Sequence, residues 1–173
     1  LAEHPMLNKL VCIKEFFPRE YYNRDNNSRT ISLGSQGSAR MMEAYRNKFI
    51  KEARTIARLQ HPNVISIHDV FEENNTAYYV MEYIDGVNLY EYVNKNGPMD
   101  TAMAKSVIMQ LSEALEYIHE KKILHLDIKP ANIMFRENGE VVLIDFGISK
   151  RYDDNGSLTT SATKAPISSV SVV

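Results

Sequence analysis

Hydrophobic residues in the first half of the chain gather in short runs that are typical of β-strands. β-branched and aromatic residues dominate three segments, each bounded by proline, glycine or a polar run, and each segment therefore predicts a strand. The three segments are residues 9–17, 64–71 and 77–83. Between the first two, apolar residues from 39 to 59 recur at spacings of three and four, which predicts an amphipathic helix that ends before His61-Pro62-Asn63.

Residues 19–38 are polar and predict a loop inserted between the first strand and this helix. The loop contains Gly34-Ser-Gln-Gly37, a glycine spacing that invites comparison with phosphate-binding loops. Such a loop follows a strand and ends in Gly-Lys-Ser or Gly-Lys-Thr, and this segment does neither. We therefore interpret it as a flexible insert.

The pattern becomes helical after Asp85-Gly86. A short helix is predicted from about residue 88 to 93, and a longer one from about 101 to 121 with its apolar residues along one face. The residues of that face are Ala104, Val107, Ile108, Leu111, Leu115 and Ile118. The final stretch from Gly156 to Val173 is rich in Ser and Thr and shows no periodicity, which predicts a mobile segment.

Together these patterns predict an α+β fold made of two lobes and a tail. The predicted parts are a mostly β first lobe at residues 1–84, a helical second lobe at 85–150 and a flexible tail at 151–173. A chain of 173 residues is long enough for one ordinary domain or two small lobes, and its 44% hydrophobic content can build a core.

Charge and cysteine content narrow the classes of function. The formal net charge of −2 provides no bulk attraction to nucleic acid or to an anionic membrane, so we expect neither as a partner. Cys12 is the single cysteine, which excludes an internal disulfide and favours a reducing compartment. No apolar run is long enough to cross a bilayer and no signal-peptide pattern opens the chain, so we expect a cytoplasmic protein.

Most of the chemistry is carried by the segment from Ile123 to Asn132, which is followed by Asp145-Phe146-Gly147. Between them, two β-rich runs flank Asn138-Gly139, a pair that predicts a hairpin with a type I′ turn. The register of such a turn, continued outward, sets Asn132 opposite Asp145. An amide oxygen and a carboxylate at the open end of a hairpin, with Asp127 close by, suit Mg²⁺ and phosphate. This combination indicates phosphoryl transfer.

Asp127 and Lys129 are the predicted catalytic residues. In phosphoryl transfer to a hydroxyl group, a nearby acid accepts the hydroxyl proton, and a lysine two residues further along an extended segment faces the same way and can steady the phosphate. Asn132 and Asp145 are the predicted Mg²⁺ ligands, because Mg²⁺ takes one or two protein oxygens together with substrate phosphates. An ordinary charged loop is the plain alternative, and the full string of residues argues against it.

His125 has no acid within the motif to act with and is predicted to be a packed, hydrogen-bonded residue rather than a base.

Lys14 lies inside an apolar strand, where a lysine usually extends its ammonium group to solvent. A functional role requires a partner acid, and the helix from 39 to 59 offers Glu52 in its second half. A pair of Lys14 with Glu52 would hold the lysine against nucleotide phosphates.

These residues resemble, in order along the chain, the motifs of the protein kinase superfamily, and specifically of serine/threonine kinases of the bacterial type. Val11-Cys12-Ile13-Lys14 is similar to the lysine strand of that family, and Glu52 falls at the glutamate of its first helix. The run from His125 to Asn132 is similar to the catalytic loop, and Asp145-Phe146-Gly147 to the magnesium motif. The resemblance implies a two-lobed kinase fold, ATP and Mg²⁺ as cofactors, and a protein substrate with Ser or Thr.

The same resemblance implies further contacts. Cys12 and Met134 would enclose the adenine of ATP, and Met81 would stand at the back of its pocket. The backbone from Glu82 through Tyr83 to Ile84 would bind the adenine edge. Four residues would stack as a hydrophobic column through the two lobes, namely Ile56, Ile67, His125 and Phe146.

The chain departs from the family pattern in ways that leave other functions open. The first 13 residues hold no glycine, Leu126 stands where the catalytic loop usually has arginine, Cys12 replaces an alanine, and no Ala-Pro-Glu follows Gly147. The resemblance therefore implies an incomplete kinase domain with weak or no transfer activity by itself, not gated by a phosphate held at position 126. The alternatives are a non-catalytic, pseudokinase-like module that binds nucleotide and a small-molecule kinase of related fold.

Overall fold

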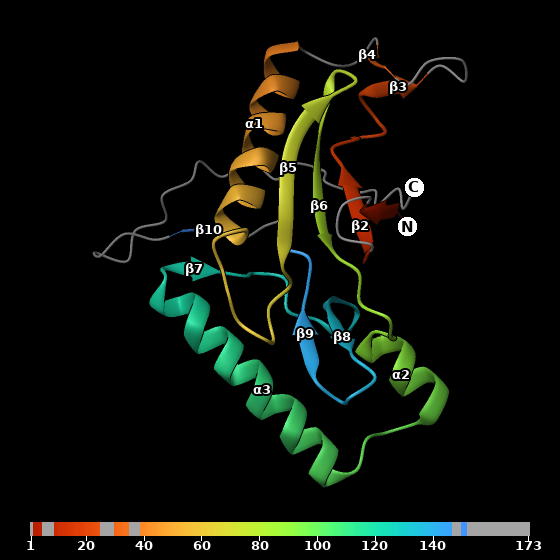
Figure 1. Cartoon of the computed structure of the whole chain (residues 1–173), viewed down its shortest axis with the longest axis vertical. Coiled ribbons are helices and arrows are strands. Elements are labelled where there is room, and N and C mark those ends of the chain that lie inside the picture. Colours follow the sequence, from red (N-terminus) through yellow and green to blue (C-terminus); the bar gives the residue numbers. More distant parts are fainter. Residues whose placement is uncertain (1, 5–8, 25–29, 35–38, 147–149, 152–173) are drawn as a thin grey trace. The chain divides into compact units, whose positions relative to one another are not determined.

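A computed structural model describes residues 2–4, 9–24, 30–34, 39–146 and 150–151 (Figure 1). The chain forms two compact units. The first contains the described residues of Leu1–Arg58 together with Ser66–Tyr83, and the second contains Leu59–Ile65 together with the described residues from Ile84 onward. Three predicted features lie wholly or mostly outside the described residues: the tail at 151–173, Gly147, and the segment Gly34–Gly37.

The first unit is built on a four-stranded antiparallel sheet with the strand order β1-β2-β6-β5 (Figure 1). In the central pair, Cys12 lies opposite Met81 and Lys14 lies opposite Tyr79. The strands are β1 (Ala2–His4), β2 (Lys9–Glu15), β5 (Ile67–Glu73) and β6 (Thr76–Glu82). The three predicted strands therefore exist, with ends that differ by a few residues.

A two-residue turn joins β5 to β6. Asn74 and Asn75 both have positive φ, at 52° and 67°, and Glu73 pairs with Thr76 on either side of them. Asparagine tolerates this conformation, which a type I′ turn requires at both central positions. The buried hydroxyl of Thr76 donates a hydrogen bond to the carbonyl of Phe16, which ties the start of β6 to the end of β2.

Helix α1 (Ala39–Ile56) packs against β5 and β6, as its apolar spacing predicts (Figure 1). Phe49 of this helix stacks on Tyr79 of β6, with 5.1 Å between the ring centroids. The buried residues of α1 are Met42, Phe49, Ile50, Ala53 and Ile56. This face fixes the rotation of the helix about its axis and thereby the direction of Glu52.

The prediction of a plain loop at 19–38 is wrong in part. Two short strands, β3 (Tyr22–Arg24) and β4 (Ile31–Leu33), pair in antiparallel fashion within it. The physical reason is burial: Ile31 is almost fully buried, and the ring of Tyr22 meets Phe16 edge to face at 5.9 Å. The apolar residues of this segment are too few and too scattered to predict a strand; they are Tyr21, Tyr22, Ile31 and Leu33.

The second unit contains two capped helices, α2 (Leu89–Asn96) and α3 (Thr101–Glu120). Asn88 and Glu91 form a reciprocal capping box at the start of α2, and the Asp100 carboxylate accepts a hydrogen bond from the N–H of Met103 at the start of α3.

The apolar face predicted for α3 is only partly buried. Of the predicted residues, Val107 and Ile118 are buried, whereas Ile108 is 63% exposed; Ala114, which was not predicted, completes the buried stripe. Because successive residues on a helix are about 100° apart, Ile108 lies a quarter-turn away from the buried stripe.

The rest of the second unit is made of short elements that follow α3. They are β7 (Ile123–Leu124), the 3₁₀ turn η1 (Pro130–Asn132), β8 (Ile133–Phe135), β9 (Val141–Leu143) and β10 (Lys150–Arg151). β10 pairs with β7, and β8 pairs with β9, both in antiparallel fashion. All three residues of β9 are fully buried, which makes it the innermost strand of this unit.

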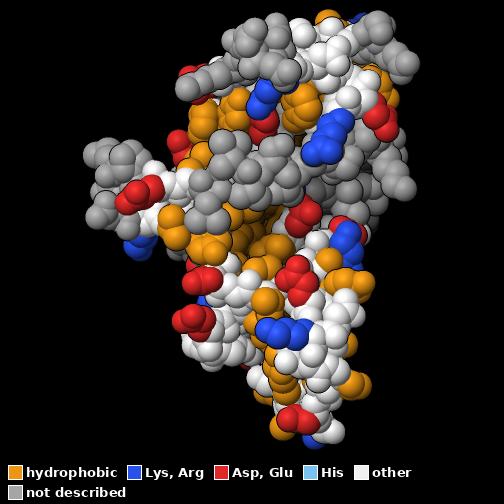
Figure 2. Space-filling model, turned by 90° about the vertical axis from the view of Figure 1, so that its right-hand side faces the viewer, with side chains coloured by type: hydrophobic (Ala, Val, Ile, Leu, Met, Phe, Trp, Pro, Cys, Tyr) orange, Lys and Arg blue, Asp and Glu red, His pale blue; other side chains and the backbone are white. Residues whose placement is uncertain are grey.

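The surface of the described residues mixes charges of both signs. On the face shown in Figure 2, acidic and basic side chains are interspersed among hydrophobic ones, as the formal net charge of −2 leads one to expect. Within the described ranges, the helices are too short or too polar to cross a membrane.

Candidate active site

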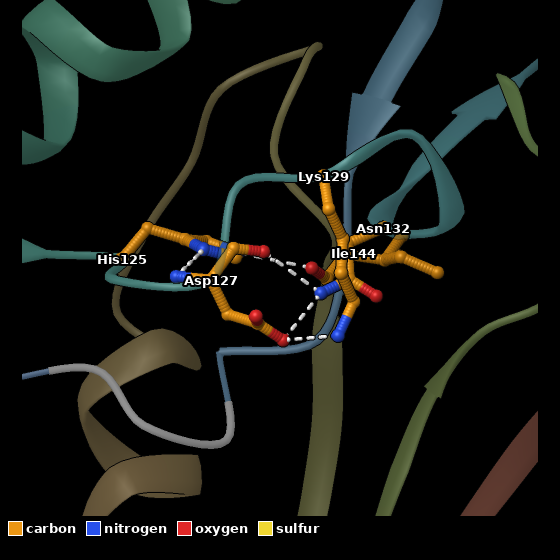
Figure 3. Close-up of polar contacts among 5 residues, drawn as sticks. All are labelled: His125, Asp127, Lys129, Asn132 and Ile144. Carbon is orange, nitrogen blue, oxygen red and sulfur yellow. Dashed lines mark hydrogen bonds and ion pairs between the residues drawn. The ribbon is translucent and has the colours of Figure 1, made fainter. Parts of the chain in front are cut away.

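His125 is a packed residue that organises the loop around it. It is 1% exposed, and its Nε2 lies 3.0 Å from the carbonyl of Ile144 while its Nδ1 accepts a hydrogen bond from the N–H of Asp127 at 3.2 Å (Figure 3). Since Nδ1 accepts, Nε2 carries the proton and donates it to the carbonyl. Burial lowers the pKa of His125, which keeps the ring neutral. The prediction of a structural histidine is confirmed.

The carboxylate of Asp127 is held by two side chains of the same loop. Its Oδ2 accepts hydrogen bonds from the ammonium group of Lys129 at 2.7 Å and from the amide Nδ2 of Asn132 at 2.9 Å (Figure 3). The Lys129 hydrogen bond is the largest cause that lowers the pKa of Asp127, and the Asn132 hydrogen bond acts in the same direction. The acid is therefore ionised at neutral pH and can accept a hydrogen bond from a substrate hydroxyl.

Asn132 is buried at the end of η1, where Pro130 supplies the fixed φ of a helix start. Its Nδ2 also donates to the backbone carbonyl of Asp127 at 2.9 Å. Both of these bonds use the amide nitrogen, so the amide oxygen remains as a ligand of the type that Mg²⁺ accepts.

The predicted register of the hairpin is wrong by one residue. Ile133 pairs with Leu143 and Phe135 with Val141, and the N–H of Ile144 donates to the carbonyl of Asn132. Asn132 is therefore opposite Ile144, and Asp145 comes one position later. A one-residue change of register turns a side chain to the other face of the strand pair, so a direct cross-strand pairing of Asn132 with Asp145 is excluded.

The cause lies in the turn. Within the turn at residues 137–139, Gly139 has positive φ, at 82°, and Asn138 does not. The N–H of Arg136 donates to the carbonyl of Glu140 around this three-residue loop. Such a loop, a type I turn followed by a glycine in the left-handed region, is the next most common hairpin connection after the two-residue turn. The side chain of Asn138 accepts a hydrogen bond from the N–H of Glu140 at 3.1 Å and so favours this alternative.

Asp145 still belongs to the same site. It lies two residues after the end of β9 at Leu143, has a φ of 60°, and lies near enough to His125 to act on the pKa of that ring. Among the described residues, no cluster of three or more His, Cys, Asp and Glu side chains could hold a metal ion. A Mg²⁺ site made of the Asn132 amide oxygen and the Asp145 carboxylate, completed by phosphate and water, stays a prediction.

Lys14 and Glu52 lie in the first unit. Lys14 is buried on β2, with its Nζ 5.8 Å from the ring centroid of Tyr79. Burial raises the pKa of Glu52 on α1 to about 7, while the positive charges of Lys48 and Lys14 lie close enough to act in the opposite direction. The ion pair of Glu52 in the structure is with Lys48, at 3.9 Å. A direct contact of Glu52 with Lys14 stays a prediction.

The residues predicted to bind adenine are divided between the two units. Cys12 on β2 pairs with Met81 on β6 in the first unit. Glu82 and Tyr83 belong to the same unit, and the N–H of Glu82 donates to the carbonyl of Ser66. Ile84 and Met134 belong to the second unit. A joint adenine site of these residues stays a prediction. For the predicted hydrophobic column, the structure shows the contact of His125 with Phe146, whose ring centroids are 4.5 Å apart.

Sequence analysis missed Asn63 and Gln110, two residues that position the strand leading to Asp145. The buried Nδ2 of Asn63 donates to Gln110 Oε1 at 3.0 Å and to the carbonyl of Val141 at 2.8 Å. Gln110 Oε1 also accepts from the N–H of Val141 at 3.0 Å, and Leu143 donates to the carbonyl of Asn63. A polar residue at 110 between apolar positions of a helix was the only available signal.

An ionised acid, a lysine and an amide that are held together on one loop are groups that suit phosphoryl transfer. The family model of the protein kinase domain matches residues 23–166, and the chain belongs to this family. The matched residues include the catalytic loop and begin after Lys14. The predicted family and the predicted α+β, kinase-like fold are thus confirmed.

Individual relatives are serine/threonine kinases of bacteria. The chain is 37% identical over 123 residues to "Serine/threonine-protein kinase PrkC" of Bacillus subtilis (strain 168), which covers 71% of this chain and 18% of that protein. It is 39% identical over 117 residues to "Serine/threonine-protein kinase PknB" of Mycobacterium tuberculosis (strain ATCC 25618 / H37Rv), covering 65% of this chain and 19% of that protein.

A solved structure described as "PpkA-294 apo form" is similar to the chain with a TM-score of 0.78 and 31% identity, over 84% of this chain and 52% of the other. The chain therefore spans about a fifth of the length of these curated relatives and about half of that structure.

Proposed function

We propose that the chain provides the nucleotide-binding and catalytic residues of a serine/threonine protein kinase, which transfers the γ-phosphoryl group of Mg·ATP to a Ser or Thr hydroxyl of a protein. The observation that carries this proposal is the carboxylate of Asp127, which Lys129 and Asn132 hold ionised while His125 fixes its backbone. An ionised acid in a fixed position is what the transfer requires, because the enzyme acts mainly by positioning and by balancing charge.

Each residue of the loop has a distinct role in this proposal. Asp127 orients the substrate hydroxyl and accepts its proton, and Lys129, which is half exposed beside it, stabilises the phosphate as it is transferred. Asn132 and Asp145 bind Mg²⁺ through oxygen atoms, and the bound ion would neutralise charge on the phosphates. Protein kinases as a family use ATP and Mg²⁺, and this donor set fits them.

The remaining sequence predictions extend the proposal. Lys14, supported by Glu52, binds the nucleotide phosphates. Cys12 and Met134 enclose the adenine, and the strand end from Met81 through Glu82 and Tyr83 to Ile84 binds its edge. The lobes at 1–84 and 85–150, the tail at 151–173 and the cytoplasmic location belong to the same proposal.

The test is phosphate transfer from labelled Mg·ATP to a generic protein substrate, with Asp127→Asn beside the unchanged chain. We expect Asp127→Asn to reduce transfer at least about a thousandfold, because the amide cannot accept the hydroxyl proton. Asp100→Asn is the matched control, since asparagine caps a helix as well as aspartate does. Measurable transfer that is equal in the unchanged chain and in Asp127→Asn would contradict the role of Asp127.

A second candidate function is a module that binds nucleotide without transferring phosphate. Binding of Mg·ATP without transfer to any acceptor would support this function, and transfer to small alcohols but not to proteins would indicate a small-molecule kinase.

A further inference from the structure

Lys48 and Glu52 form an ion pair on one helix that is largely shielded from solvent. They stand four positions apart on α1, with 3.9 Å between Nζ and Oε1. The side chain of Glu52 is only 14% exposed and that of Lys48 25%. The pair Arg136–Glu140 has the same spacing and the same distance, but its side chains are 27% and 48% exposed. Solvent weakens the exposed pair much more than the buried one.

The surroundings of Glu52 disfavour its charge. Phe49 lies one turn before it on α1 and stacks on Tyr79, and Lys14 lies opposite Tyr79 in the sheet. Glu52 Oε1 is buried without a hydrogen-bond partner among the described residues. Burial accordingly raises the pKa of Glu52 to about 7, and the charges that act against this rise are those of Lys48 and Lys14, with Lys48 the stronger.

We propose that Lys48 is a positioning residue of the nucleotide site: its ammonium group, 3.9 Å from the buried Glu52 carboxylate, favours the charged form of this carboxylate, which can bind Lys14. The inference rests on the proposed function, because it assigns Glu52 as the partner of the phosphate-binding lysine. Lys48 lies outside the kinase motifs, and in this inference nucleotide binding depends on the positive charge that Lys48 carries on α1.

The direction of the effect follows from electrostatics. An adjacent cation stabilises the ionised form of a carboxylate, and burial destabilises it. Without Lys48, the described charges acting on Glu52 are reduced to Lys14 on β2. Glu52 then remains protonated to a higher pH, and a protonated acid offers Lys14 a dipole in place of a charge. Lys48 therefore supports the Lys14–Glu52 pair rather than competing with it.

The first test measures the ionisation of Glu52 directly in the full chain. The side-chain carboxyl carbons of glutamate are labelled with ¹³C and followed by NMR from pH 4 to 10, and Glu52→Gln identifies the signal. We expect Lys48→Gln to move the midpoint of Glu52 upward by about one pH unit. Lys48→Arg should restore it, and Lys51→Gln, which removes an exposed lysine of the same helix, should leave it in place. Equal midpoints in the unchanged chain and in Lys48→Gln would overturn the inference.

The second test measures binding of Mg²⁺ and the ATP analogue AMP-PNP over the same pH range. Affinity should rise as Glu52 ionises, and at pH 7.5 Lys48→Gln should bind about threefold more weakly, with recovery at higher pH. A shifted Glu52 midpoint with an unchanged pH profile of binding would overturn the role of Lys48 in the nucleotide site. Failure of the unchanged chain to bind the analogue at any pH would overturn the proposed nucleotide site, whereas the NMR result would still decide the ionisation of Glu52.

Discussion

At the scale of single residues, Glu52 shows how burial decides the ionisation of a carboxylate. Its side chain is only 14% exposed, and its strongest described counter-charge is an ammonium group 3.9 Å away. Asp127 is the opposite case, because two hydrogen bonds to its Oδ2 lower its pKa. The pKa values of these two acids thus shift in opposite directions, because burial dominates at Glu52 and hydrogen bonds dominate at Asp127.

The raised pKa of Glu52 predicts a pH-dependent stability. Glu52 binds its proton more tightly in the folded chain, at a pKa of about 7, than in the unfolded chain, at about 4.5. Its contribution to stability is therefore complete below about pH 4.5 and is lost as the pH rises through 7. We expect the free energy of unfolding of the unchanged chain to fall by roughly 2 kcal/mol more than that of Glu52→Gln between pH 5 and 8.

Urea unfolding of both proteins at the two pH values measures this difference. Glu43→Gln, an exposed substitution on the same helix, serves as the control for removal of a surface carboxylate. Parallel pH dependence of the unchanged chain and Glu52→Gln would contradict the raised pKa.

At the scale of secondary structure, the hairpin of β8 and β9 shows what one glycine determines. Gly139 has a φ of 82°, and a Cβ atom added there would meet no other atom within 4 Å. The cost of alanine at this position is therefore backbone strain alone, and we expect Gly139→Ala to lower the free energy of unfolding by about 1 kcal/mol. Asn138→Ala should cost less than half of that, because Asn138 does not have positive φ.

Urea denaturation of the two variants separates the two possible turns. A type I′ turn needs positive φ at both 138 and 139, so it would make both substitutions costly. Equal losses would contradict the observed register, and with it the placement of Asn132 opposite Ile144.

Sequence patterns predicted the long elements well and the short ones poorly. The helical spacing of apolar residues in α1 and the apolar runs of β2, β5 and β6 are long enough that single exceptions do not hide the pattern. The strands β3 and β4 have three residues each, and their pairing depends on burial of Ile31 and Tyr22 against residues far away in sequence. The hairpin register was wrong because Asn-Gly is compatible with two turn geometries, and local sequence does not choose between them.

In the candidate site, residues that are close in sequence could be predicted, and residues that are far apart in sequence could not. His125, Asp127, Lys129 and Asn132 lie within eight residues, so their spacing already placed them on one loop, and the structure brings them into contact. Asn63 and Gln110 are 47 residues apart, and Val141 lies 31 residues beyond Gln110. Contacts of that range follow from the tertiary fold and leave no periodic signal in a single sequence.

At the scale of the whole molecule, the chain passes from the first unit to the second and back again at Leu59–Ile65. This segment belongs to the second unit, while the residues before and after it belong to the first. It is held there by hydrogen bonds from Gln60 to the Tyr117 hydroxyl at 2.8 Å and from Ile65 to the carbonyl of Leu143 at 3.1 Å, in addition to those of Asn63. The stability of β9 therefore depends on a segment that interrupts the sequence of the other unit.

The last prediction concerns the loss of this anchor. Asn63→Ala removes the donor to the carbonyl of Val141 and leaves a cavity, and we expect it to cost roughly 2–3 kcal/mol of the stability of the second unit. Native-state hydrogen exchange resolves the two units. The amides of Val141 and Leu143 should lose protection in the variant, whereas those of β2 and β6 should change little, since Asn63 bonds to neither. Asn96→Ala, at an exposed site in α2, is the matched control. A uniform loss of protection over both units would show instead that they unfold as one, and an unchanged exchange rate at Val141 would show that Asn63 does not stabilise β9.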